Sequence, residues 1–120
     1  MSVVYWDTML FVYWFEENPA WVDRIEAIFA SMETRGDRLV TSAFALGELL
    51  VGPKKVGAID AAERMQSGLM ELAEILPFTA RSAAHYSAIR ANHDVSPAEA
   101  IHLATAADAG GLRVHRAVLV

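Results

Sequence analysis

Three acidic side chains lie at positions where a small α/β domain would bring them together. Asp7 follows a short apolar run, Glu48 interrupts an apolar helical segment, and Glu99 falls in the first turn of a later helical segment. Carboxylate oxygens suit Mg²⁺ or Mn²⁺ better than zinc, which favours nitrogen and sulfur ligands. Such an ion would orient a water molecule, lower its pKa and stabilise the charge on a phosphodiester during cleavage. We therefore predict a magnesium or manganese site built from these acids.

Two of the three acids also have a purely structural explanation as helix caps. Asp7 precedes Thr8 at a predicted helix start, and aspartate is a favoured N-cap residue. Ser96 and Glu99 have the spacing of a capping box, in which the glutamate reaches back to the backbone of the cap residue. Thr8 and Ser42 could contact water or phosphate through their hydroxyls, although helix capping accounts for each of them as well. The sequence leaves these alternatives open.

Glu48 is the acid that a structural role explains least well. Its helical neighbours Phe44 and Val51 are apolar, which predicts a helix that is buried nearly all round. A buried carboxylate needs a partner, because removing an unpaired charge from water is costly. A metal ion is one possible partner, and Arg81 or Arg90 is the alternative.

The elements that must position these acids follow from apolar runs and turn residues. Runs rich in β-branched and aromatic residues predict short strands at 3–6, 39–41, 75–78 and 112–120. Helical spacing, capping residues and breakers predict helices at 8–16, 19–35, 43–51 (stopped by Gly52 and Pro53), 55–72, 80–91 and 97–109. Strands therefore alternate with pairs of helices along the chain.

This order predicts an α/β fold with three layers, in which a central short-stranded parallel sheet is flanked by helices. Ligands of open α/β sheets bind beyond the carboxyl ends of the strands. Asp7 lies at such an end, and Glu48 lies less than two turns into the helix after the second strand. We therefore expect these two acids and Glu99 to point into one cleft.

Composition excludes several other classes of protein. The net charge is −5 and no polybasic stripe is present, which argues against a DNA-binding module. A nuclease remains compatible, because a bound divalent ion supplies local positive charge. The chain has no cysteine, which excludes disulfides and thiolate chemistry. No basic leader and no apolar run of about 18 residues is present, so we expect no signal peptide, no membrane span and a cytoplasmic location.

The four histidines and the serines do not indicate another enzyme class. Glu99 and His102 have the Glu-x-x-His spacing of di-iron bundles, but that site requires a second copy of the motif, which the chain lacks. His85, His93 and His115 are isolated, which predicts surface or loop positions. The chain also lacks the Gly-x-Ser-x-Gly elbow of serine hydrolases and a phosphate-binding glycine loop.

An aromatic segment, residues 11–15, is too apolar for one face of a helix. One interpretation is a helix that is buried on two sides. The other is an interface with a partner, where aromatic side chains are enriched. The hydrophobic content of 54% is compatible with both, because it predicts either a very full core or apolar surface kept for a partner.

Taken in order, these segments resemble the PIN-domain family, and more narrowly the VapC-type ribonuclease toxins of VapBC toxin–antitoxin systems. The similarity runs from residue 3 to about 111 and rests on the stretches YWDT (5–8), TSAFALGELLVGP (41–53), LPF (76–78) and SPAEAIHLATA (96–106). It implies a metal-dependent endoribonuclease that acts on RNA, forms a homodimer and is silenced by a cognate antitoxin. The tail of such an antitoxin fills the active-site groove.

The resemblance also implies the roles of individual residues. The first family aspartate corresponds to Asp7 and the family glutamate to Glu48. The third acid, normally aspartate in the context Pro-x-Asp-Ala-Ile-His, corresponds to Glu99, which is longer by one methylene, so the metal geometry must adjust.

The C-terminal region departs further from the family pattern, which ends with a strand followed by Thr-Asn-Asp. Residues 112–120 contain no acid, and His115 or Arg116 occupies roughly the place of the fourth one. Asp94 and Asp108 are nearby acids, for which solvation at a loop or helix end is the simpler explanation. We expect one PIN-like domain over residues 1–120, shortened at its C-terminus. Three acids can still hold Mg²⁺ through waters, so an active nuclease remains compatible with the missing fourth acid. The alternative to an active nuclease is a catalytically weak or inactive module that binds a partner protein or RNA.

Overall fold

The computed structural model describes residues 2–110 and the backbone of 113–115. The elements are β1 (Val3–Trp6), α1 (Thr8–Phe15), α2 (Val22–Arg35), β2 (Arg38–Ser42), α3 (Ala43–Lys55), α4 (Ile59–Leu72), β3 (Glu74–Leu76), α5 (Ala80–Asn92), α6 (Pro97–Ala109) and β4 (Arg113–His115). The predicted order of strands and helix pairs is confirmed. The rest of the strand predicted at 112–120 lies outside the described residues.

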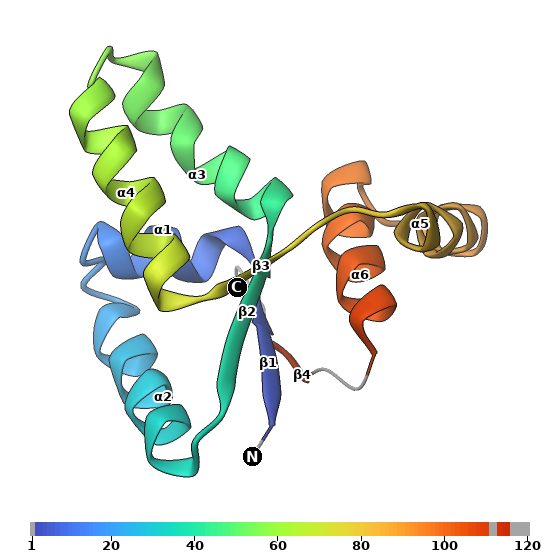
Figure 1. Ribbon diagram of the computed structural model, residues 1–120, viewed down its shortest axis with the longest axis horizontal. Helices are drawn as coiled ribbons and strands as arrows, with labels where there is room; N and C mark the ends of the chain where they lie inside the picture. Colours follow the sequence, from blue (N-terminus) through green and yellow to red (C-terminus); the bar gives the residue numbers. More distant parts are fainter. Residues whose placement is uncertain (1, 111–112, 116–120) are drawn as a thin grey trace.

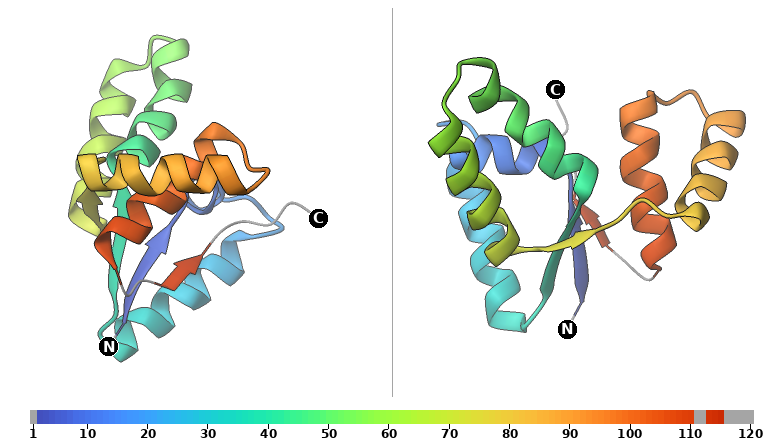
Figure 2. Two further views of the ribbon diagram at one scale, coloured as in Figure 1. Left: turned by 90° about the vertical axis from the view of Figure 1, so that its right-hand side faces the viewer. Right: turned by 45° about the horizontal axis from the view of Figure 1, so that its top comes forward.

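The described strands form one parallel sheet in the order β3-β2-β1-β4. Helices α1 to α4 lie on one side of this sheet and α5 and α6 on the other, so the molecule has three layers (Figures 1 and 2). The α/β fold predicted from the sequence is confirmed. Every connection between strands that are consecutive in the sequence carries two helices, and the parallel strands end at the same edge of the sheet.

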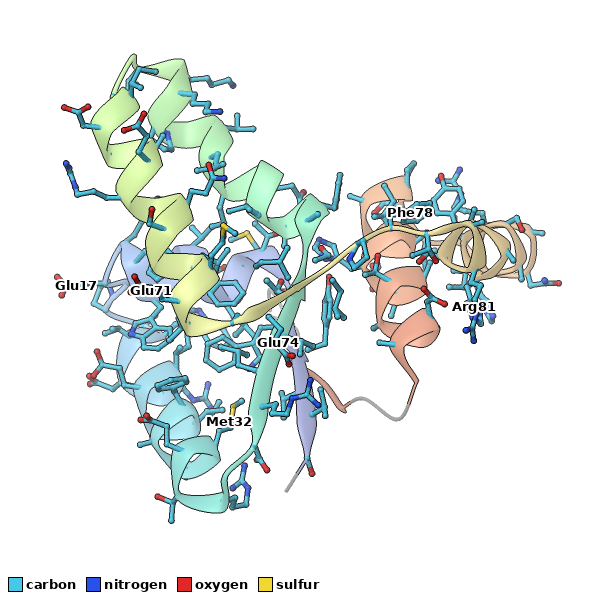
Figure 3. The ribbon with its side chains drawn as sticks, in the orientation of Figure 1. Glu17, Met32, Glu71, Glu74, Phe78 and Arg81 are labelled. Carbon is cyan, nitrogen blue, oxygen red and sulfur yellow. The ribbon has the colours of Figure 1, made fainter. Side chains whose placement is uncertain are left out.

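The side chains of β1 point alternately to the two faces of the sheet and belong to two separate parts of the core. Val4 and Trp6 pack into the larger cluster with α1, α2 and α4, and Met32 of α2 points toward this side of the sheet (Figure 3). Tyr5 packs on the opposite face, in a smaller cluster with Val40 and Ala106. Successive side chains of a strand point to opposite faces. The face of β1 that carries Tyr5 is therefore the face that meets α6.

Most of the aromatic segment belongs to the larger cluster, as the first of the two interpretations predicts. Phe11 is fully buried and Tyr13 nearly so, whereas Phe15 at the end of α1 is exposed. The ring of Tyr13 stacks on Trp21, with 5.5 Å between ring centroids. Helix α1 is thus a core helix whose last turn reaches the surface.

Helix α2 begins at Val22, three residues later than predicted. The carbonyl of Asn18 accepts hydrogen bonds from the backbone N–H groups of Trp21 and Val22, and its side chain accepts one from Ala20. These bonds hold 18–21 as a turn, and Trp21 has a φ of −126°, outside the helical range. The predicted start at Pro19 is therefore wrong, because the Asn18 turn precedes the helix.

Helix α3 does not stop at Gly52 and Pro53, as predicted, but continues to Lys55. The proline lacks a backbone N–H, so the helix loses one hydrogen bond at this position. Packing of α3 against α4 favours the longer helix. The glycine that ends it is Gly57, whose φ of +72° suits a residue without a Cβ. The helix predicted to begin at 55 consequently begins at Ile59.

Strand β3 is shorter than predicted, because Pro77 has no N–H to donate to a neighbouring strand. Thr79 then begins α5 with a capping box, in which its side chain accepts from the backbone N–H of Ser82. The side-chain hydroxyls of Thr79 and Ser82 also donate to the carboxylate of Asp108 at the end of α6, at 2.7 and 3.2 Å. Arg81 lies 3.3 Å from the same carboxylate. Asp108 was predicted to be merely solvated, and instead it ties the start of α5 to the end of α6.

None of the described helices is both long enough and apolar enough to cross a membrane.

We predict that Asp108→Asn lowers the melting temperature at neutral pH. The hydroxyl of Thr79, together with Ser82 and Arg81, holds the pKa of the Asp108 carboxyl below its ordinary value of 3.8. A carboxylate with a lowered pKa stabilises the fold above its unfolded pKa, and this stability is lost as the pH falls through the folded pKa. The difference between wild type and variant should therefore shrink below about pH 4. Thermal melts across this range test it; a difference that is constant with pH would contradict it.

Candidate active site

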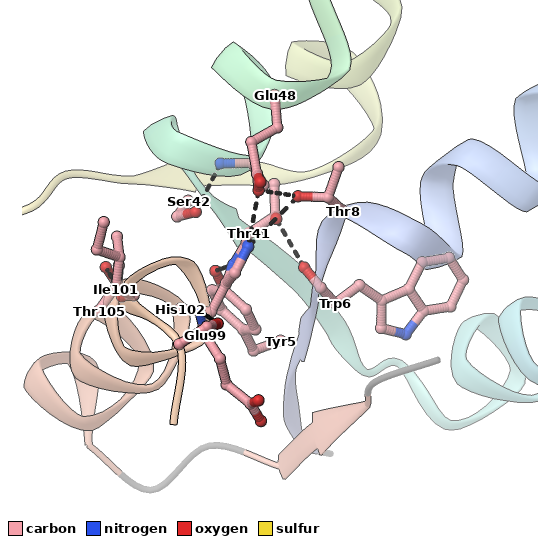
Figure 4. Close-up of polar contacts among 12 residues, drawn as sticks. Tyr5, Trp6, Thr8, Thr41, Ser42, Glu48, Glu99, Ile101, His102 and Thr105 are labelled. Carbon is pink, nitrogen blue, oxygen red and sulfur yellow. Dashed lines mark hydrogen bonds and ion pairs between the residues drawn. The ribbon is translucent and has the colours of Figure 1, made fainter. Parts of the chain in front are cut away.

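The candidate site lies at the carboxyl ends of β1 and β2, where α1 and α3 begin and α6 passes alongside (Figure 4). Asp7 is the first residue after β1 and occupies the N-cap position of α1, but its side chain makes no capping hydrogen bond. Its Oδ1 oxygen is shielded from solvent. Capping therefore does not explain why an aspartate stands here.

Glu48 projects from α3 toward the end of β1. Its Oε1 accepts a hydrogen bond from the hydroxyl of Thr8 at 2.5 Å and lies 2.9 Å from Nε2 of His102 (Figure 4). About a third of its side chain is exposed, and Val51 in the next turn is half exposed. The prediction that this helix is buried nearly all round is therefore wrong, because one face of α3 reaches solvent.

The alternative considered for Glu48, an arginine partner, is wrong. Arg81 pairs with Asp108 on the other side of the sheet, and Arg90 is exposed on α5. The partners of Glu48 are instead a hydroxyl and an imidazole. Neither neutralises a carboxylate as an arginine would, so the negative charge remains available to a cation.

His102 is nine-tenths buried and joins Glu48 to β1. Its Nδ1 lies 2.6 Å from the hydroxyl of Tyr5, and its ring packs edge-on against both Tyr5 and Phe44. A carboxylate can only accept, so Nε2 must carry the hydrogen that is donated to Glu48. In a neutral imidazole Nδ1 is then the acceptor, and the Tyr5 hydroxyl donates to it. Thr8 lies within 3.4 Å of the same Nε2.

The Tyr5 hydroxyl keeps its hydrogen. Burial raises the pKa of its hydroxyl to about 12, and the negative charges of Asp7 and Glu48 also oppose its ionisation. The phenol remains protonated throughout the physiological range of pH.

The ends of β1 and β2 are fastened together beneath the site. The hydroxyl of Thr41 donates to the backbone carbonyl of Trp6 at 2.7 Å, in the buried interior. Ser42 is also buried, and its Oγ accepts from the backbone N–H of Ala45, which confirms the predicted helix cap. These bonds fix where α3 leaves the sheet, and with it the direction of Glu48.

Glu99 stands apart from the other two acids as the side chains lie. Its backbone N–H donates to Ser96, which caps α6 as predicted, and its carboxylate is directed away from Glu48 in the view of Figure 4. Within 2–110, no group of three or more histidine or acidic side chains stands in an arrangement that could hold a metal ion. The structure does not assemble the predicted three-acid cluster in this conformation.

Asp7 and Glu48 nevertheless supply the oxygen ligands that a hard divalent cation requires. Mg²⁺ keeps several waters and is commonly bound through one or two carboxylates together with substrate phosphates, rather than in an all-protein cage. The donor chemistry therefore fits Mg²⁺ or Mn²⁺.

Two residues of the site, Tyr5 and His102, were not among the predicted site residues. The sequence does contain a signal for each. His102 lies three residues after Glu99, a spacing that places both on the same face of α6. Tyr5 lies two residues before Asp7, the spacing of side chains that point to the same side of an extended strand. His85 and His93 are exposed, as predicted, and the side chain of His115 lies outside the described part.

We predict that a titration of tyrosinate absorbance contains a late phase near pH 12, which Tyr5→Phe removes. Burial favours the neutral phenol, so this hydroxyl ionises above the ordinary value of 10.0. Tyr86→Phe is the matched control and should retain the late phase. The absence of any phase later than the ordinary value would contradict the burial of the Tyr5 hydroxyl.

Residues 4–116 match the family model described as PIN domain. No curated protein sequence matches the chain. Among solved structures, VapBC2 from Rickettsia felis bound to a promoter DNA fragment is similar at 15% identity and a TM-score of 0.75, covering 97% of this chain and 99% of the other. DNA-bound VapBC from Salmonella typhimurium has 20% identity, a TM-score of 0.75 and coverages of 97% and 98%.

A third structure, the sarcin–ricin loop cleaving toxin VapC20 from Mycobacterium tuberculosis, has 16% identity and a TM-score of 0.75, with coverages of 96% and 89%. At such identities the three structures establish a shared fold. The family match rests on the sequence itself and spans nearly the whole chain, from β1 through β4. The chain therefore belongs to the PIN-domain family.

Proposed function

We propose that this protein is a divalent-metal-dependent endoribonuclease, and that it is the toxin of a type II toxin–antitoxin pair in the cytoplasm. The observation that carries the proposal is the placement of Asp7 and Glu48 at one edge of a PIN-domain sheet, where Thr8, the residue after Asp7, donates a hydrogen bond to Glu48. PIN nucleases generally use divalent ions, and one structure of the same fold is a toxin that cleaves the sarcin–ricin loop.

Asp7 and Glu48 would hold the ion, which is Mg²⁺ or Mn²⁺ in this proposal. Glu99 lies on the same helix as His102 and would join them through a change of its side-chain rotamer. A bound ion supplies the positive charge that stabilises a phosphodiester as negative charge develops on it. This charge is needed here, because a protein of net charge −5 otherwise repels an RNA backbone.

The protein's own residues contribute orientation. Thr8 donates to Glu48 from the first turn of α1, directly beside Asp7, and so couples the positions of the two acids. Ser42 is buried as a helix cap, which makes Thr8 the better candidate for contact with water or phosphate.

The proposed protein partners are a cognate antitoxin and a second copy of the chain. Two of the structures with the same fold are VapBC assemblies, which supports the antitoxin. Exposed apolar side chains are available for such contacts at the α3–α4 turn, where Val56 and Ile59 reach solvent, and at Phe15 and Met70.

A second candidate function is a non-catalytic PIN-like module that binds a partner protein or RNA. It is favoured by one observation, the lack of a three-ligand metal group within the described side chains. Thermal melts with and without millimolar Mn²⁺ separate the two candidates, since a ligand that binds only the folded state raises the melting temperature. The nuclease proposal expects a rise; an unchanged melting temperature favours the binding module.

We predict that Asp7→Asn abolishes metal-dependent RNA cleavage and leaves the fold intact. The amide keeps the size of the side chain but removes the negative charge that would hold the ion. Cleavage of a mixed RNA pool is measured with Mn²⁺, Mg²⁺ or EDTA, and folding is checked by thermal melts. Glu48→Gln should behave in the same way.

Asp60→Asn is the matched control, because Asp60 is an exposed acid in the first turn of α4. This variant should cleave RNA as the wild type does. Full activity of a well-folded Asp7→Asn variant would rule out the proposed role of the acid. Inactivity of the wild type, with no stabilisation by Mn²⁺, would favour the binding module instead.

A further inference from the structure

A continuous chain of hydrogen bonds connects the interior of the sheet to the carboxylate of Glu48. It runs from the hydroxyl of Tyr5 to Nδ1 of His102 at 2.6 Å, and from Nε2 of His102 to Oε1 of Glu48 at 2.9 Å. Its three members come from β1, α6 and α3, so it joins segments separated by up to 97 positions in the sequence. Figure 4 shows the imidazole lying between the phenol and the carboxylate.

The imidazole has little freedom to turn. Its centroid lies 5.9 Å from that of Tyr5 and 5.3 Å from that of Phe44, with both rings edge-on to it. A buried phenol that donates to Nδ1 also fixes which nitrogen carries the hydrogen, and this leaves Nε2–H directed at Glu48. The orientation of the ring is thus set by Tyr5 and Phe44, and its tautomer by the phenol at Nδ1 together with the carboxylate at Nε2.

The two hydrogen bonds that Glu48 accepts from side chains within 2–110 end on the same oxygen. Thr8 and His102 both reach Oε1, and together they hold the carboxylate in one orientation while its side chain remains partly exposed. Two donors to one oxygen leave Oε2 as the atom that can face a ligand. An exposed glutamate without such bonds would sample several rotamers, and a cation would have to order it on binding.

We propose that His102, oriented by Tyr5, is a positioning residue that holds Oε1 of Glu48 and so presents Oε2 to a divalent cation. The part of this inference that concerns the cation rests on the proposed function. The part that concerns the tautomer and the orientation of Glu48 stands on the metal-free protein. Comparable outer partners of metal ligands change metal affinity by about 10–100-fold when they are removed.

Two variants of His102 separate positioning from packing. The amide nitrogen of glutamine reaches about as far as Nε2 of histidine, whereas that of asparagine reaches only as far as Nδ1. His102→Gln therefore keeps a donor to Glu48, and His102→Asn offers the same amide too far away. Tyr5→Phe keeps the histidine and removes only the group that orients it.

The first measurement is the Mn²⁺ concentration that gives half of the maximal thermal stabilisation. We expect His102→Asn to raise it by about 10–100-fold, Tyr5→Phe to raise it less, and His102→Gln to remain close to wild type. Equal weakening by the two amides would show that the imidazole only fills space and would overturn the proposal. So would an unchanged value in His102→Asn.

The second measurement is made without metal, by NMR of the protein with ¹⁵N-labelled histidine at neutral pH. The proposal expects hydrogen on Nε2 of His102 in the wild type, and a redistribution of hydrogen between the two ring nitrogens in Tyr5→Phe. Hydrogen on Nδ1 in the wild type would overturn it. If Mn²⁺ does not stabilise even the wild type, the proposed metal-dependent function fails, and the tautomer alone then supports or overturns the positioning role.

Discussion

The parallel pairing of β1 with β2 is the constraint on which the candidate site depends. In parallel strands the carboxyl ends lie at the same edge, so Asp7 after β1 and the start of α3 after β2 are brought together by the sheet itself. The bond from the Thr41 hydroxyl to the Trp6 carbonyl fastens these two ends. A shift of one residue in this register would exchange the faces of β1 and turn Tyr5 away from α6. The positions of Asp7, of Tyr5 and of the start of α3 therefore follow from the register of two short strands.

The order and type of the elements could be predicted because their signals are local. Apolar runs of β-branched and aromatic residues mark β1 and β2, and Ser42 and Ser96 cap their helices as their sequence context indicates. The predicted helix boundaries are wrong where a contact elsewhere in the chain outweighs the local preference of a residue. Pro53 would end an isolated helix, but α3 continues past it alongside α4, and the Asn18 turn displaces the start of α2.

The site could be predicted only in part, for a related reason. The sequence indicates Asp7 because it follows an apolar strand, and Glu48 because an acid in an apolar helical segment needs a partner. His102 was not assigned to the site, because the residue it bonds lies 54 positions away and only the packing of α6 against the sheet and α3 brings them together. The orientation of Glu99 depends on a rotamer, which residue spacing does not determine. Sequence spacing therefore indicates which face of a helix meets the site, and tertiary packing decides which side chains complete it.

Different parts of this molecule tolerate substitution to different degrees, which bears on how the same fold arises in chains of 15–20% identity. The cluster around Val4 and Leu39 is held by burial alone, and apolar residues of similar volume can replace one another there at modest cost. The chain from Tyr5 through His102 to Glu48 is different, because each member must donate or accept at a fixed place. Replacing one member leaves a buried polar atom without its partner, which costs more than a small change in packing. Many core positions therefore accept several apolar residues without loss of the fold. The few residues that orient Glu48 accept almost no substitution, because each must donate or accept a hydrogen bond at a fixed place.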